Sequence, residues 1–99
     1  MRPYVLLKQA SETFRFGVSF EDWLGDGETI DAGSSQVVAE KDGQDVTSEF
    51  LTSPSVQGPV LSVRLLPGFQ AGDRIKVSFR AATSEGNLYE EDVFVMIFD

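Results

Sequence analysis

The residues of this 99-residue chain that could do chemistry are carboxylates, and five of the sixteen gather in one turn, residues 21–31. The acidic side chains of this turn are Glu21, Asp22, Asp26, Glu28 and Asp31. Clustered carboxylates bind Ca²⁺, but an EF-hand loop needs alternate acidic positions, a central glycine and a closing glutamate, and this segment lacks that spacing. We therefore favour a solvated turn, predict no metal site and no cofactor, and leave weak cation binding by the turn open.

Composition removes the parts of most catalytic sites. The chain has no histidine and no cysteine, so it lacks the commonest general base, a thiolate nucleophile and any disulfide. Paired carboxylates could act on a glycoside, but they need a deep cleft, for which a domain of this size has little room. The glycine-rich segments 25–33 and 66–73 are followed by neither a lysine nor a helix, so turns explain them better than a phosphate loop does. We predict that the protein is not an enzyme.

The charge balance limits the kinds of partner. Sixteen acidic and eight basic residues give a formal net charge of −8, which repels phosphate backbones and anionic lipid. We therefore predict partners that are neither nucleic acid nor membrane. No apolar run approaches the ~18 residues of a membrane span or the ~7–15 residues of a signal peptide, so we expect assembly in the cytoplasm. An apolar fraction of 41% predicts one globular domain, residues 1–99.

The elements that must position these side chains are strands. In residues 13–20, Phe14, Phe16, Val18 and Phe20 share one face, the period of a half-buried strand. Residues 73–83 repeat the pattern, with alternate residues predicted to face inward (Ile75, Val77, Phe79, Ala81) and outward (Lys76, Ser78, Arg80). Further strands are expected at residues 4–9, 35–40, 46–51, 60–66 and 88–98, with a loop at 53–59. About seven strands separated by turn signals are typical of a β-sandwich.

Trp23, the only tryptophan, follows the strand predicted at residues 13–20. A lone tryptophan in this position is more often part of the core. We therefore favour a core position, with an exposed platform for stacking a sugar or a base as the alternative.

The last predicted strand is apolar without alternation over residues 93–98. Either the Val93, Val95 and Ile97 set or the Phe94, Met96 and Phe98 set must therefore face away from the core. Two explanations stay open. Residues 4–7 could pack beside this strand as a partner strand, or the outward set could form a protein–protein interface.

Two stretches, SFEDWLGDGETIDAG and LSVRLLPGFQAGDRIKVSFRAATSEGNLYEEDVFVMI, resemble immunoglobulin-like domains of tailed-phage structural proteins, including fiber-tail adaptor proteins. The best part is Asp22-Trp23-Leu24 with residues 25–30. The resemblance covers residues 13–98, and residues 37–59 depart from it. It implies an all-β fold, an immunoglobulin-like antiparallel β-sandwich. It also implies a non-enzymatic virion module at the tail, neck or fiber attachment.

On this interpretation the partners are other virion or tail proteins, with a homo-oligomer left open. The predicted partner contacts are Trp23, Asp26, Phe69, Phe94, Met96 and Phe98. The alternative function is an adhesion module that binds carbohydrate through Trp23, Phe69 or Tyr89.

Overall fold

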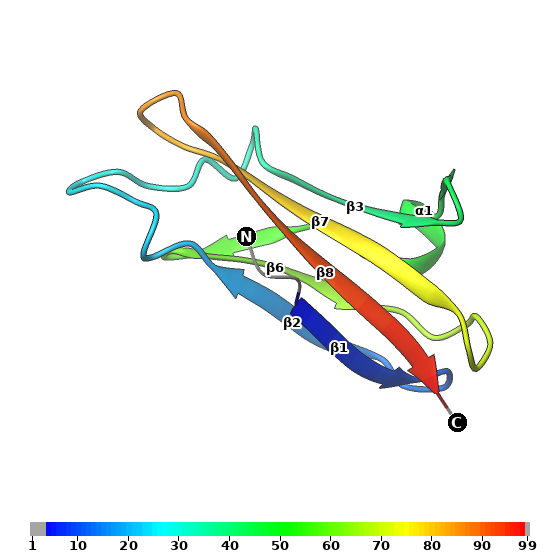
Figure 1. The fold of residues 1–99 in the computed structure, drawn as a ribbon. Coiled ribbons are helices and arrows are strands. Elements are labelled where there is room, and N and C mark those ends of the chain that lie inside the picture. The colour runs from blue at the N-terminus through cyan, green and yellow to red at the C-terminus, as the bar shows by residue number, and fades with distance from the viewer. Residues whose placement is uncertain (1–3, 99) are drawn as a thin grey trace.

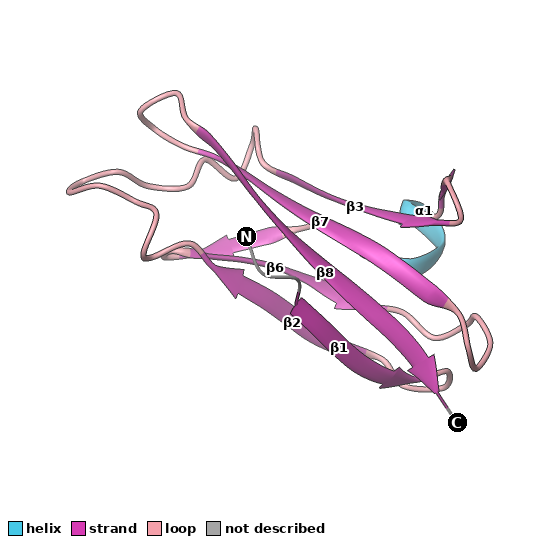
Figure 2. Cartoon of the chain, viewed as in Figure 1, coloured by secondary structure: helices cyan, strands magenta, loops and turns pink. Residues whose placement is uncertain are grey.

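Two β-sheets packed face to face form the protein (Figures 1 and 2); the structure, a computed structural model, describes residues 4–98. The larger sheet has the order β1-β8-β7-β3-β4 and the smaller sheet the order β2-β6-β5. In chain order the strands are β1 (Tyr4–Gln9), β2 (Phe14–Ser19), β3 (Gln36–Lys41), β4 (Gln44–Asp45), β5 (Ser55–Gln57), β6 (Val60–Leu65), β7 (Arg74–Ala82) and β8 (Leu88–Phe98). A single helical turn, α1 (Thr47–Phe50), lies between β4 and β5.

The strand order is that of an immunoglobulin domain. The series β8-β7-β3-β4 and β2-β6-β5 follow the G-F-C-C′ and B-E-D orders of that fold. All pairings are antiparallel except β1 with β8, which run parallel. The predicted all-β, immunoglobulin-like sandwich is confirmed. It has eight strands and not seven, because two short ones, β4 and β5, were not expected and the strand predicted at residues 46–51 is absent.

The core between the sheets is built from the alternation that the sequence shows. In β7 the four residues predicted to face inward, Ile75, Val77, Phe79 and Ala81, are at most 1% exposed. Of the residues predicted to face outward, Ser78 is buried instead, because its small side chain lies between the longer neighbours Val38 and Asp92 on the adjacent strands.

Aromatic packing joins the two sheets at their centre. The rings of Phe16 on β2 and Phe79 on β7 meet edge to face, with centroids 6.1 Å apart. These two strands correspond to those that carry the inter-sheet disulfide in antibody domains. A chain without cysteine thus closes the sandwich here by apolar contact alone.

The strand predicted at residues 46–51 is wrong. Residues 47–50 form the helix α1. Phe50 is buried four positions after the N-cap Val46, which a helical turn places on the same side, and the C-cap Leu51 is extended and also buried. The Thr47 hydroxyl accepts a hydrogen bond from the Ala39 backbone N–H at 2.9 Å and so fixes the turn against β3. The loop predicted at residues 53–59 contains β5.

Candidate interaction surfaces

The six predicted contact residues lie in three separate places. Trp23 and Asp26 belong to the loop between β2 and β3, at the same end of the sandwich as the β7–β8 hairpin (Figure 1). We call this the loop end. Phe69 lies in the loop between β6 and β7, at the opposite end. The other three lie along β8.

The outward set of β8 is Phe94, Met96 and Phe98, because Val93, Val95 and Ile97 are at most 2% exposed. The expected partner strand is present: β1 pairs with β8 and sets Val5 beside Phe94 and Leu7 beside Met96. This pairing extends the apolar face and does not cover it, since Leu7 is 63% and Val5 56% exposed. The resulting outer apolar patch consists of Val5, Leu7, Phe94, Met96 and Phe98.

Basic side chains border this patch on β7. The Arg74 guanidinium lies 4.9 Å from the centroid of the Phe94 ring, a cation–π contact. Lys76 is the cross-strand neighbour of Phe94. In a chain of net charge −8, the patch therefore has a locally basic margin.

Trp23 is 44% exposed, so the predicted core position is wrong. Phe20, only 1% exposed, fills the core at the loop end instead. The Trp23 backbone N–H donates to the Phe20 carbonyl at 2.9 Å in a tight turn that carries Trp23 past the core. Its ring packs against Tyr89 with centroids 5.6 Å apart.

Glu28 holds the two loops of the loop end together, and it is only 8% exposed. Its carboxylate accepts hydrogen bonds from the Thr83 hydroxyl at 2.5 Å, the Gly25 backbone N–H at 2.8 Å and the Asn87 amide at 2.9 Å. These donors, led by the Thr83 hydroxyl, lower the pKa of Glu28. The Asn87 amide also donates to the Tyr89 hydroxyl at 3.2 Å, which connects Glu28 to the Trp23–Tyr89 pair.

The other four carboxylates of the acidic turn, Glu21, Asp22, Asp26 and Asp31, are exposed. Asp31 accepts hydrogen bonds from the Gly33 N–H and the Ser34 hydroxyl. Within residues 4–98, no three His, Cys, Asp or Glu side chains come together as a metal ion would require. No helix in the same range is long and apolar enough to cross a membrane.

Phe69 does not join the other aromatic residues proposed for carbohydrate. Its backbone has a φ of 64°, and its partly buried ring meets Phe50 edge to face with centroids 5.3 Å apart. Only Trp23 and Tyr89 of the three predicted platform residues therefore lie together.

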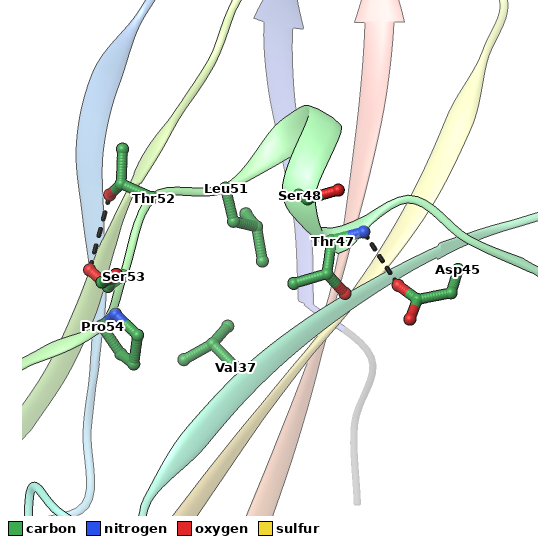
Figure 3. Close-up of a pocket in the computed structure, with 8 residues that line it drawn as sticks. All are labelled: Val37, Asp45, Thr47, Ser48, Leu51, Thr52, Ser53 and Pro54. Atoms are coloured by element: carbon green, nitrogen blue, oxygen red, sulfur yellow. Dashed lines mark hydrogen bonds between the residues drawn. The ribbon is translucent and has the colours of Figure 1, made fainter.

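A hollow of about 600 Å³ opens between β3, α1 and the chain that follows α1 (Figure 3). Its lining residues are Val37, Asp45, Thr47, Ser48, Leu51, Thr52, Ser53 and Pro54. The one carboxylate, Asp45, accepts a hydrogen bond from the Thr47 backbone N–H at 2.9 Å. A hollow with a single carboxylate does not supply the pair that glycoside chemistry needs.

Sequence reasoning missed Val5, Leu7 and Arg74 as members of the outer face, and Glu28 as the residue that orders the loops. The available signal for the first two was that residues 4–7 are apolar at every position, so that one face of this strand had to lie outside the core.

Comparison with known proteins places these surfaces in context. The family model described as "Podophage GP4 fiber-tail adaptor protein gp77" matches residues 8–96. No curated protein sequence gives a significant match. A crystal structure of the titin M10–obscurin-like 1 Ig complex is similar at 21% identity and a TM-score of 0.49, over 97% of this chain and 85% of that one. The collagen-binding domain of the Erysipelothrix rhusiopathiae surface protein RspB is similar at 18% identity and a TM-score of 0.35, over 90% and 38%.

Proposed function

Because the chain belongs to the podophage GP4 fiber-tail adaptor family, we propose that it attaches to a neighbouring tail protein through the outer apolar patch. The family consists of structural proteins of the phage tail and not of enzymes, so the chain is a tail component of the virion that binds other tail proteins. Which of its surfaces makes that contact is the proposal.

The observation that carries the proposal is the exposure of the patch. Leu7, Val5 and Phe98 are 63%, 56% and 41% exposed and adjoin Phe94 and Met96 on one face of the larger sheet. Contiguous apolar surface of this kind on a small acidic domain is typical of a protein–protein contact, because its removal from water drives association.

The margin of the patch indicates the chemistry of the partner. Arg74 and Lys76 favour a surface that is apolar at its centre and acidic at its edge. Two copies of this chain joined patch to patch would bring their basic margins together, so we propose a different protein as the partner. The net charge of −8 supports the further proposal that nucleic acid and membrane are not partners.

A matched pair of leucines tests the contact. Leu7 is 63% and Leu88 is 65% exposed, but Leu88 lies at the loop end, outside the patch. In a phage that lacks its own copy of the gene, we expect supplied Leu7→Glu protein to be missing from assembled particles and Leu88→Glu protein to be present. Both variants should keep the wild-type unfolding midpoint in urea, because both side chains are exposed. Normal incorporation of Leu7→Glu and of Phe94→Ser would overturn the proposal.

The oligomeric state provides a second test. We expect native mass measurement to give a monomer over a wide concentration range, in line with a heterotypic contact. A dimer that Leu7→Glu dissociates would instead assign the patch to self-association.

One observation favours a second candidate function, carbohydrate binding at the loop end. Trp23 is exposed and its ring packs on Tyr89, which presents an aromatic surface at the end of the sandwich where the loop also carries the exposed Asp26. Binding on a glycan array that is lost in Trp23→Ala would support this function, and an array without signal would remove it.

A further inference from the structure

Strand β2 offers a free edge on the smaller sheet. It lies at the end of the order β2-β6-β5 and, among residues 4–98, pairs with β6 alone. The Phe20 backbone N–H donates to the Pro59 carbonyl at 2.8 Å. Every second residue before Phe20, namely Val18, Phe16 and Phe14, therefore also directs its backbone N–H and C=O groups toward β6. Because backbone groups alternate between the two sides of a strand, Arg15, Gly17 and Ser19 direct their N–H and C=O groups away from the sheet.

A cleft of about 280 Å³ runs beside this edge, between β2 and the β1–β8 pair of the other sheet. Its lining residues are Tyr4, Phe16, Gly17, Val18, Ser19, Glu91 and Val93. The side chains of Phe16, Val18 and Val93 give the wall an apolar part, and the Glu91 carboxylate is its single charged side chain. The Tyr4 and Phe16 rings pack together across it with centroids 5.8 Å apart.

We propose that the free edge of β2 accepts an extended segment of a partner protein as an added strand, which places an apolar and a basic side chain in the cleft. The backbone groups of Arg15, Gly17 and Ser19 supply the ladder of hydrogen bonds that strand addition requires. The apolar wall takes one side chain, and Glu91, in a chain of net charge −8, takes a lysine or arginine two positions away along the added strand.

The opposite face of the added strand must carry small side chains. Arg15 lies across the outside of the smaller sheet, where its guanidinium donates to the Ser55 and Ser62 hydroxyls at 3.1 Å each. A second copy of β2 does not fit the cleft, because its inward side chains, Phe14, Phe16 and Val18, include no lysine or arginine to pair with Glu91. This edge is separate from the outer apolar patch and does not depend on it.

The test uses two synthetic peptides of defined sequence, acetyl-TKTVTKT-amide and acetyl-TETVTET-amide. In either strand direction, the first presents a valine flanked by lysines to the cleft and threonines to Arg15. Titrated into the ¹⁵N-labelled full chain, the lysine peptide should shift the amide signals of Arg15, Gly17 and Ser19 and slow their hydrogen exchange. It should bind roughly tenfold more tightly than the glutamate peptide, and Glu91→Gln should reduce that preference.

The matched variants are Ser19→Pro and Ser19→Ala. Proline removes the outward N–H without removing a bond to β6, so Ser19→Pro should stay folded and lose the peptide, whereas Ser19→Ala should keep it. The proposal is overturned if neither peptide shifts the β2 amides or if Ser19→Pro binds as wild type does. It is also overturned if the same amides shift with protein concentration alone, because the occupant is then a second copy.

Discussion

Two charged side chains are buried at opposite ends of the sandwich, and both have a pKa below the ordinary value. Glu28 at the loop end is 8% exposed, and Lys8 near the far end of β1 is 0% exposed. For a carboxylic acid a lowered pKa means that the folded protein favours the charged form. For a lysine it means that the folded protein disfavours the charged form.

The difference comes from the number of partners. Glu28 receives three hydrogen bonds from donors on two loops. The Lys8 ammonium donates to the neighbouring Gln9 carbonyl at 3.0 Å and lies 5.7 Å from the centroid of the Phe50 ring. Burial outweighs the attraction of Glu12 and lowers the pKa of Lys8. Hydrogen bonds to the buried Glu28 carboxylate thus hold the loop end together. The opposite end is held by apolar packing, and the buried Lys8 ammonium does not stabilise it.

Removal of the Phe50 ring should give the largest effect, because packing holds the Lys8 end. Phe50 is 0% exposed and contacts both Lys8 and Phe69. We expect Phe50→Ala to lower the free energy of unfolding by about 3–5 kcal/mol in urea denaturation. The control Phe98→Ala, at a position 41% exposed, should cost about 1 kcal/mol or less. Equal losses would contradict a packing-dependent end.

The loop end should respond to loss of charge without loss of volume. In Glu28→Gln an amide NH₂ replaces one carboxylate oxygen and faces the Thr83 hydroxyl and the Asn87 amide, which are donors to the native carboxylate. We expect a lower unfolding midpoint than in the control Glu21→Gln, and red-shifted, less anisotropic emission from Trp23. As the only tryptophan, Trp23 reports on the loops directly. Wild-type emission in Glu28→Gln would show that the loops do not depend on the charge.

Acid should weaken the loop end selectively. Because the folded pKa of Glu28 lies below its ordinary value of 4.5, its stabilising contribution is complete above that value and is lost as the pH falls through the folded pKa. Asp45, whose pKa is lowered by Thr47, also titrates in acid, so wild type must be compared with Glu28→Gln. We expect the difference between their thermal midpoints to shrink between pH 7 and pH 3. A constant difference would contradict the assigned role.

The sandwich could be predicted from sequence because strand alternation is a local signal. The nine residues of β7 are enough to predict an inward face made of Ile75, Val77, Phe79 and Ala81, and all four are buried in the structure. Reliance on a local signal also explains the wrong strand predicted at residues 46–51. Val46, Phe50 and Leu51 are apolar, but a segment this short has too few positions to distinguish the period of two of a strand from the period of 3.6 of a helix.

The order of the loop end could not be predicted, because its contacts are long-range. Glu28 is bonded to Thr83 and Asn87, which lie 55 and 59 residues further along the chain. In the sequence it is one acid among five in a turn. The exposure of Trp23 follows from Phe20 filling the core first, a competition that no spacing along the chain reveals.

Replacement of Lys8 should have the smallest effect on the free energy of unfolding, and it tests whether the buried ammonium stabilises its end of the sandwich as Glu28 does the other. In Lys8→Met a flexible apolar side chain replaces the buried ammonium, which has one backbone acceptor and the face of Phe50. Replacing a poorly compensated buried charge by an apolar group is often neutral or stabilising, so we expect the free energy of unfolding at pH 7 to be unchanged or to rise by about 1 kcal/mol.

The dependence of the free energy of unfolding on pH above 7 distinguishes the loss of the buried charge in Lys8→Met from a simple gain in packing. The folded pKa of Lys8 lies below its ordinary value of 10.5. Between these two pKa values the unfolded chain binds more protons than the folded protein, so the free energy of unfolding of wild type rises as the pH rises through this range. Lys8→Met should lack that contribution, whereas the control Lys76→Met, on the partly exposed outer face, should retain it. Urea denaturation at pH 7 and pH 10 measures both. An identical pH dependence in wild type and Lys8→Met would show that the ammonium is as well compensated as the Glu28 carboxylate, and the two ends would then be alike.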